Sequence, residues 1–249
     1  MAVGGVVVTL AFLLPLHDAG FRETALEFAF LSVVVSATSG TPGATVMAIL
    51  LSLAWVTGPG VDRRRGVEFV VLALALALFL AGGARFNERV LKRTFEVPRP
   101  NIELLAKTPS SDAPVLGMSA DAFYAQADKA ERRAVLERVL NAPEIDAVLS
   151  LPPIARAYWR GQTGFSLPSG HAFASCFLAM FFLLLNLAGG EGWRWILACC
   201  LPVWAVLVCY ARLLLFVHTP ADVLSGGFLG VGLGSVAAAA VWLAIARLD

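Results

Sequence analysis

Three short polar clusters stand among long apolar runs, and their side chains are of the types that transfer a phosphoryl group. Each lies at the end of an apolar run, where ionisable side chains are costly unless they have a function. Two of the chain's three histidines fall within them. The clusters are Lys92 with Arg99, the Pro-Ser-Gly-His run at residues 168–171, and Arg212 with His218 and Asp222.

The cations of these clusters, Lys92, Arg99 and Arg212, can clamp the non-bridging oxygens of a phosphate group. Arginine does so with two parallel hydrogen bonds, whereas lysine acts as a point charge. The backbone amides of Gly170 and His171, at a helix start, point at the same place and add the positive end of the helix dipole. These groups would hold a phosphate without a metal ion.

The remaining groups can supply the nucleophile and the acid. His218 is placed to attack phosphorus, and Asp222, one helical turn further on, can hold its imidazole in the nucleophilic tautomer. His171 would protonate the leaving oxygen and later activate water. Since Asp222 can favour the tautomer of one histidine only, the two histidines would divide the work of nucleophile and acid.

Each residue also has a simpler explanation when it is taken alone. Lys92 and Arg99 could be interfacial cations whose side chains reach lipid head groups. Ser169, before an apolar run, is a typical helix N-cap, and Arg212 could complement the carbonyl end of its helix. Asp222 could belong to a capping box. Together, however, the groups make one coherent reaction.

The composition indicates a protein of the lipid bilayer. Hydrophobic residues make up 58% of the 249 residues, charged residues make up 15%, and the mean hydropathy is +0.76. A water-soluble domain of this length cannot bury so much apolar surface. The net charge of +1 gives no basic excess for nucleic acid, and the four cysteines lie in apolar runs without metal-ligand spacing. We therefore expect no nucleic-acid partner, no structural metal and no cofactor.

Six apolar, charge-free runs are long enough, or nearly so, to cross the bilayer, and we expect the shorter ones to extend past their charged flanks. A further helix, Phe21–Val35, is expected in the interface, because the turn-forming residues Ser39–Gly43 interrupt the apolar run that contains it. The predicted spans are residues 2–16, 44–57, 69–84, 171–187, 195–211 and 223–246.

Orientation follows from Arg63, Arg64 and Arg65, which directly follow the second predicted span and so indicate a cytoplasmic loop. Alternation of the spans then places all three polar clusters on the outer, periplasmic face. The outer segment between the third and fourth spans, Arg85–Gly170, also carries many cations. Long translocated segments are exempt from the charge rule, so these cations do not oppose the assignment.

We predict an all-α fold, a six-span transmembrane bundle with a small helical periplasmic cap. The whole chain, residues 1–249, forms a single domain, and the cap, about residues 101–162, is inserted between spans three and four. Within the cap we expect helices at Ser119–Leu140 and Pro143–Ser150. The last span carries Gly226, Gly230 and Gly234 at four-residue spacing, which favours close packing inside the bundle. The oligomeric state stays open.

The three clusters resemble the signatures of the type 2 phosphatidic acid phosphatase superfamily. Lys92 and Arg99-Pro100 fit the first signature, residues 168–171 the second, and Arg212, His218 and Asp222 the third. The resemblance implies that His218 is the nucleophile, that a phosphohistidine forms, and that His171 is the acid. It departs at Ala211, where the family usually has serine. The implied phosphate-binding set is Lys92, Arg99, Ser169, Gly170 and Arg212.

Further runs, Asp121–Tyr124 and Thr163–Leu167, are similar to those of bacterial phosphatidylglycerophosphatases of the B type. The similarity implies a metal-independent enzyme of the bacterial inner membrane that acts on lipid phosphates, phosphatidylglycerophosphate or undecaprenyl diphosphate first among them. A lipid A phosphatase or another lipid-phosphate phosphatase is the alternative. More remote alternatives are a vanadate-dependent haloperoxidase, which is disfavoured by the six spans, and a non-catalytic lipid-binding or transport protein, which is disfavoured by the intact clusters.

Overall fold

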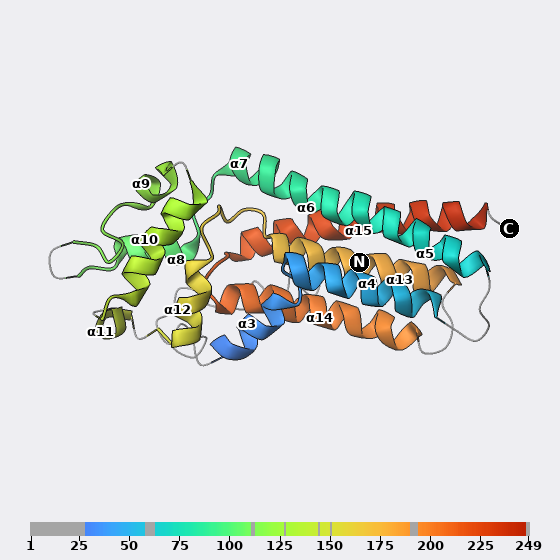
Figure 1. Ribbon diagram of the computed structural model, residues 1–249, viewed down its shortest axis with the longest axis horizontal. Helices are drawn as coiled ribbons and strands as arrows, with labels where there is room; N and C mark the ends of the chain where they lie inside the picture. Colours follow the sequence, from blue (N-terminus) through green and yellow to red (C-terminus); the bar gives the residue numbers. More distant parts are fainter. Residues whose placement is uncertain are drawn as a thin grey trace.

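The computed structural model of the chain describes residues 28–57, 63–110, 113–126, 128–143, 145–149, 151–189 and 194–247. Within these ranges the chain forms helices joined by loops, and the only strand-like feature is an isolated bridge between Pro109 and Pro114. Figure 1 shows an elongated molecule with long helices side by side along one half and short helices gathered at the other end. The all-α prediction is confirmed for the described residues.

Four helical runs in the described part are long and apolar enough to cross a membrane. The count rises to five if the bent pair α3 (Ala29–Ala37) and α4 (Thr41–Val56) is one span. The predicted first span, residues 2–16, lies outside the described residues, so the prediction of six spans stays untested there. The four runs are Arg65–Lys107, Gly170–Leu187, Arg194–Leu214 and Pro220–Ala246.

The third predicted span, residues 69–84, extends at both ends, as expected of a short span with charged flanks. An almost continuous helical run places Lys92 well beyond the apolar stretch. The run ends at Phe95, and the next residue, Glu96, has a φ of 48°. Pro98 then prevents further helix. The run consists of α5 (Arg63–Ala75), the π-helical η1 (Leu76–Ala81), α6 (Gly82–Phe86), the π-helical η2 (Asn87–Leu91) and α7 (Lys92–Phe95).

The helices α13 (Gly170–Gly189) and α15 (Pro220–Ala246) pack against each other more closely than side chains would allow. A Cβ atom at Gly226 would lie 2.3 Å from the Ser169 carbonyl oxygen, and one at Gly230 would lie 2.3 Å from that of Phe173. The glycine spacing thus brings two backbones into contact, as predicted for packing inside the bundle. This contact places the start of α13 beside the start of α15.

The elbow between α3 (Ala29–Ala37) and α4 (Thr41–Val56) bends the chain by 58°. A Cβ at Gly43 would lie 2.1 Å from the Ala37 carbonyl oxygen, so the bend requires glycine there. An interfacial helix was predicted at Phe21–Val35. The described part of that range contains α3, which ends two residues later, at Ala37, and residues 21–27 lie outside the described residues. The position of α3 in the membrane interface stays a prediction. Helix α3 packs against α14 (Arg194–Leu214) and α12 (Pro153–Arg160).

The cap departs from prediction in one helix. Ser119–Leu140 was predicted as a single helix, which is wrong. One helix ends at Ala125, and Asp128 caps the next, since its carboxylate accepts a hydrogen bond from Ala130 N at 3.1 Å. The short helix predicted at Pro143–Ser150 is confirmed as α11. The cap helices are α8 (Pro100–Lys107), α9 (Ala120–Ala125), α10 (Lys129–Asn141), α11 (Ile145–Leu149) and α12 (Pro153–Arg160).

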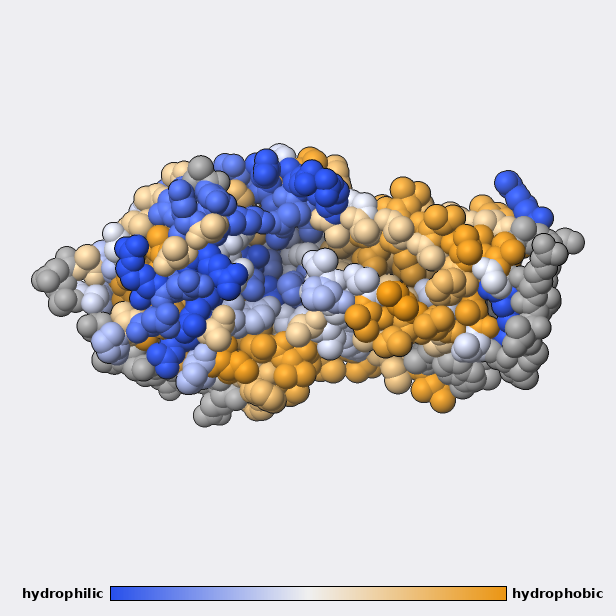
Figure 2. All heavy atoms as spheres, in the orientation of Figure 1, coloured by the Kyte–Doolittle hydropathy of each residue, from blue (hydrophilic) through white to orange (hydrophobic). Residues whose placement is uncertain are grey.

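The two halves have separate apolar cores and different surfaces. One core lies among the long helices and the other among the cap helices and α3. In Figure 2 hydrophilic residues gather over the cap, whereas hydrophobic residues cover the long helices. Large apolar side chains such as Leu74, Leu78 and Ile196 are exposed there. An apolar surface of this extent is the kind that lipid covers.

Candidate active site

The three polar clusters meet where the long helices join the cap. Ser169 N donates to the Asp222 carbonyl oxygen at 2.9 Å, which joins the second cluster to the third. Ser166 N donates to the Val97 carbonyl oxygen at 2.8 Å, which joins the loop before α13 to the first cluster. The convergence predicted from the hydropathy pattern is therefore present, and backbone hydrogen bonds maintain it.

His218 lies in the loop between α14 and α15, and its two ring nitrogens have different partners. Arg99 Nη1 donates to His218 Nε2 at 3.1 Å. Because a guanidinium group can only donate, Nε2 carries the lone pair and the ring proton sits on Nδ1. Nδ1 lies 3.3 Å from Ser166 Oγ and 3.5 Å from Asp222 Oδ2. This is the tautomer that a histidine nucleophile needs.

The environment of His218 keeps the ring neutral. The side chain is buried, and burial, followed by the positive charges of Arg99, Arg212 and Lys92, lowers the pKa of His218 well below its usual range. A histidine with a depressed pKa keeps its lone pair at neutral pH. His218 therefore presents a neutral ring with a free lone pair, which is what a nucleophile requires.

Asp222 makes the contacts that both of its expected roles require. Its Oδ2 accepts from Thr219 N at 2.6 Å, and Thr219 Oγ1 accepts from Asp222 N at 3.3 Å, which is the capping box of α15. The same oxygen accepts a hydrogen bond from the Ser166 hydroxyl and faces His218 Nδ1. The helix cap thus fixes the carboxylate that faces the His218 ring.

Arg99 and Lys92 are buried and held by different kinds of partner. Arg99 Nε donates to the Gly164 carbonyl oxygen at 2.8 Å, and its Nη1 donates to that of Val217 at 3.0 Å. Lys92 Nζ lies 2.9 Å from Glu88 Oε2, and Glu88 Oε1 lies 2.5 Å from Lys129 Nζ of α10. Glu88 therefore links the first cluster to the cap.

Arg212 is fully buried and lies behind the residues that line the cavity. Its Nη1 donates to Ser36 Oγ at 2.7 Å and to the Tyr158 hydroxyl, and its Nη2 donates to Gln162 Oε1 at 3.2 Å. Gln162 in turn lines the cavity. All these partners are neutral oxygens, so the positive charge of Arg212 is not cancelled by them and remains available to an anion.

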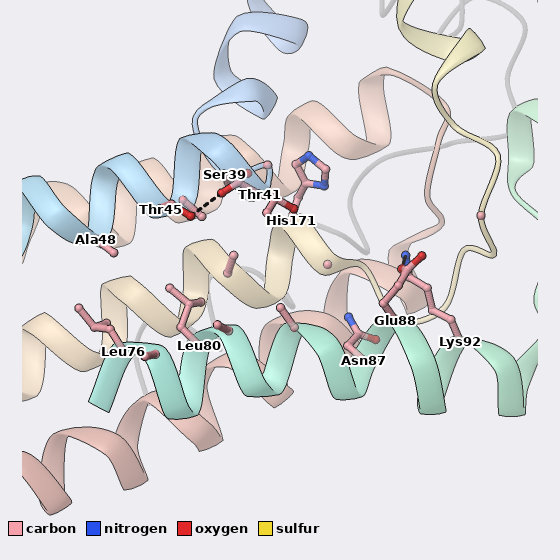
Figure 3. Close-up of a pocket in the computed structure, with 18 of the residues that line it drawn as sticks. Ser39, Thr41, Thr45, Ala48, Leu76, Leu80, Asn87, Glu88, Lys92 and His171 are labelled. Carbon is pink, nitrogen blue, oxygen red and sulfur yellow. Dashed lines mark hydrogen bonds and ion pairs between the residues drawn. The ribbon is translucent and has the colours of Figure 1, made fainter. Parts of the chain in front are cut away.

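A cavity of about 820 Å³ extends from the three polar clusters along the side of the long helices. Its polar end includes His171, His218, Lys92 and Arg99, and Figure 3 shows His171 beside the elbow residues Ser39 and Thr41. The apolar end runs between α4 and the α5–η1–α6 run. The residues of that end are Ala44, Ala48, Ile49, Phe69, Ala73, Leu76, Ala77, Leu80, Ala81 and Ala84.

The structure adds site residues that the sequence reasoning missed. Tyr124 of α9 accepts a hydrogen bond from Arg99 N at 3.1 Å and stacks on Phe165 at 4.6 Å between ring centroids. Burial raises the pKa of Tyr124, so its hydroxyl stays protonated. In the sequence, only a family resemblance singled out the two runs that carry these rings, residues 121–124 and 163–167. Nothing in the sequence singled out four further residues of the site, Ser36, Tyr158, Glu88 and Lys129.

Ala211 immediately precedes Arg212 and is buried. The hydroxyl expected there is absent, whereas the Ser36 hydroxyl from α3 contacts the Arg212 guanidinium. Among the described residues, no group of three or more His, Cys, Asp or Glu side chains is arranged to hold a metal ion.

Comparison with known proteins agrees with the signatures. A family model described as the PAP2 superfamily matches residues 69–246. Proteins named phosphatidylglycerophosphatase B from Escherichia coli K12, Escherichia coli O157:H7 and Shigella flexneri are each 31% identical over 179 residues, which is 71% of this chain. The chain spans 61% of the length of each of these relatives. The three signature clusters all lie within the residues that the family model matches.

Proposed function

Since the chain belongs to the PAP2 superfamily, we propose that it is a membrane lipid phosphatase that releases phosphate through a phosphohistidine intermediate. The observation that carries this proposal is the shape of the cavity. One end has the histidines and cations that phosphoryl transfer requires, and the other is an apolar groove between membrane helices. A phosphate head group and the hydrocarbon tail of the same molecule fit these two ends.

The first step is attack by His218 on the bound phosphate. Lys92, Arg99 and Arg212 neutralise the non-bridging oxygens, and the Arg99 hydrogen bond that now rests on Nε2 passes to one of them. The Nε2 lone pair forms the N–P bond as the P–O bond to the lipid breaks. The bonding electrons leave with that oxygen, which takes a proton from the His171 ring, protonated at the start of the step.

The second step returns the enzyme to its starting state. His171, now neutral, takes a proton from water as the water oxygen bonds to phosphorus. The N–P bond breaks, its electrons return to His218 Nε2, and inorganic phosphate leaves. Gly170 and His171 open α13, and their backbone amides would hold the phosphate during both steps. The Ser169 amide is already bound to the Asp222 carbonyl oxygen. No metal ion takes part in either step of this proposal.

We further propose that the site lies at the periplasmic face of a bacterial inner membrane. The support is the Arg63–Arg65 run, which begins α5 at the opposite end of the long helices from the site. In this orientation the cap, residues 101–162, is periplasmic.

The substrates that we propose are phosphatidylglycerophosphate, undecaprenyl diphosphate, or both. The first is supported by the name of the relatives, and the second by the same pairing of a phosphate with a long apolar chain. A lipid A phosphatase remains the second candidate.

The test is phosphate release by the purified protein from these lipids in detergent micelles, with and without EDTA and vanadate. We expect activity that survives EDTA and is inhibited by vanadate, which resembles a five-coordinate phosphorus and suits a cationic pocket. Loss of activity on chelation, restored by a divalent ion, would contradict the metal-free mechanism. Folded protein with no activity on any lipid phosphate would favour a non-catalytic lipid-binding role.

A further inference from the structure

Ser166 lies in the loop before α13 and is buried against the catalytic histidine. Its side chain has no solvent exposure. Its hydroxyl donates to Asp222 Oδ2 and lies 3.3 Å from His218 Nδ1. None of the functional roles inferred from the sequence used this residue.

The proton positions around this hydroxyl follow from chemistry. An ionised carboxylate only accepts, so the single hydroxyl proton points at Asp222 Oδ2. The Ser166 oxygen must then accept from His218 Nδ1, which carries the ring proton because Arg99 donates to Nε2. The contacts therefore form one chain, Nδ1–H to Oγ and Oγ–H to Oδ2, in which every donor faces an acceptor.

The hydroxyl also lies closer to His218 than the carboxylate does. Nδ1 is 3.3 Å from Ser166 Oγ but 3.5 Å from Asp222 Oδ2. Asp222 Oδ2 is already engaged by Thr219 N at 2.6 Å and by the serine itself. A hydroxyl polarised by a carboxylate is a stronger acceptor than a free one, because successive hydrogen bonds strengthen one another.

We propose that Ser166 is a positioning residue for His218, through which Asp222 acts on the ring. It holds Nδ1 as a donor and so keeps the lone pair on Nε2, facing the phosphate. When Nε2 bonds to phosphorus the imidazole becomes positively charged, and the polarised oxygen stabilises that charge while the hydroxyl keeps its own proton. This inference rests on the proposed phosphatase function.

The backbone of Ser166 makes the placement specific. Its N–H donates to the Val97 carbonyl oxygen at 2.8 Å, between Lys92 and Arg99. The same residue thus contacts the first signature through its backbone and the third through its side chain. A serine that only filled space would not require its hydroxyl between a carboxylate and an imidazole.

The test compares Ser166→Ala with wild type, using Ser175→Ala as a matched control. Ser175 is equally buried, but its hydroxyl donates only within its own helix, to the Ala172 carbonyl oxygen. We expect Ser166→Ala to lower kcat about 10- to 100-fold, the value of one hydrogen bond to a charged group, with KM within about twofold. The rate of phosphoenzyme formation in a single turnover should fall by the same factor. Ser166→Thr, which keeps the hydroxyl, should recover part of the lost rate.

A double-mutant cycle with Asp222→Asn separates positioning from packing. If Asp222 acts through Ser166, removing the Ser166 hydroxyl in the Asp222→Asn background should lower kcat by less than about twofold. Equal losses in both backgrounds, or a Ser166→Ala enzyme as active as Ser175→Ala, would overturn the proposal. Wild-type protein that releases no phosphate would instead refute the proposed function, so the two failures are distinguishable.

Discussion

Arg99 donates a hydrogen bond to one ring nitrogen of His218, and the Ser166 hydroxyl, which donates to Asp222, faces the other. The first contact makes Nε2 an acceptor, and the second makes Nδ1 a donor, so the two agree on one tautomer. His171 lies beside the elbow before α4, near enough that its Nε2 would be 3.4 Å from a Cβ at Gly40. The two histidines therefore have different surroundings, which suits different roles.

These roles predict different responses to loss of each ring. His218→Ala should lower kcat about 10⁴-fold or more and abolish any acid-labile phosphoenzyme, because no other group supplies the lone pair. His171→Ala should lower kcat about 10²- to 10⁴-fold on a lipid phosphate but far less on an aryl phosphate, whose leaving oxygen needs no proton. Phosphate release and acid-quenched labelling would measure both. Substantial turnover by His218→Ala would contradict the mechanism.

Sequence reasoning reached the charged residues of the site but not the hydroxyls that position them. Lys92, Arg99 and Asp222 could be selected because charge is rare and costly in an apolar chain. Ser36 and Ser166 could not be selected in that way, because a serine is unremarkable in an apolar run. Their roles arise only when the fold places them against Arg212 and His218.

Ser36 gives a residue-level prediction about the departure at Ala211. The Ser36 hydroxyl is one of three neutral oxygens that hold Arg212, so Ser36→Ala should lower kcat/KM about fivefold, the value of one ordinary hydrogen bond. Ala211→Ser, which returns a hydroxyl next to Arg212, should recover part of the loss in the same background. Ser235→Ala, whose hydroxyl donates only to the Val231 carbonyl oxygen, is the control. An unchanged Ser36→Ala enzyme would separate Ser36 from the site.

At the level of elements, the site depends on how closely α13 and α15 approach. Ser169 opens α13 and Asp222 lies in the first turn of α15, and the two are joined by the 2.9 Å hydrogen bond between their backbones. That bond is possible because α15 presents glycines to α13. The glycine spacing could be read from the sequence, since four residues is close to one helical turn.

A prediction for this interface compares two glycines of α15. Gly230→Ala should destabilise the protein by about 3 kcal/mol, because the new Cβ would lie 2.3 Å from the Phe173 carbonyl oxygen and backbone cannot move aside cheaply. The new Cβ of Gly232→Ala would meet no atom within 4 Å, so this variant should be as stable as wild type or more stable. Thermal unfolding in detergent measures both. Similar melting temperatures for the two variants would show that the helices can separate without cost.

The cap shows where element prediction failed. Hydropathy and spacing gave one helix at Ser119–Leu140, whereas Asp128 begins a second helix within it. A side chain that can sit inside a helix or cap a new one has no sequence signal that separates these uses. The contact that decides is tertiary: Tyr124 of α9 must reach Arg99 N, and α10 must bring Lys129 to Glu88.

On the scale of the whole molecule, the long-helix half and the cap face different solvents, and the site lies at their boundary. The proposed periplasmic position of the site predicts that the cap is accessible from outside the cell. With the exposed Cys199 and Cys200 replaced by alanine, Ala122→Cys in the cap should react with an impermeant thiol reagent in intact spheroplasts. Gly66→Cys, exposed at the opposite end, should react only after the membrane is opened. The reverse pattern would move the site to the cytoplasm.

The groove that runs from the site along α4 and η1 yields a last prediction about the lipid tail. Ala77 and Leu78 are consecutive residues of η1, but Ala77 lines the cavity, whereas Leu78 is 67% exposed on the outer surface. Ala77→Phe should therefore fill part of the groove and lower kcat/KM for a long-chain lipid phosphate about tenfold or more, the loss expected when several buried methylene groups are displaced. It should leave kcat/KM for a water-soluble short-chain phosphate nearly unchanged, because that molecule needs only the polar end. Leu78→Phe, which adds the same ring one residue away, should affect neither substrate. Equal losses on both substrates would mean that Ala77→Phe distorts the phosphate site, and no loss on either would mean that the tail lies outside this groove.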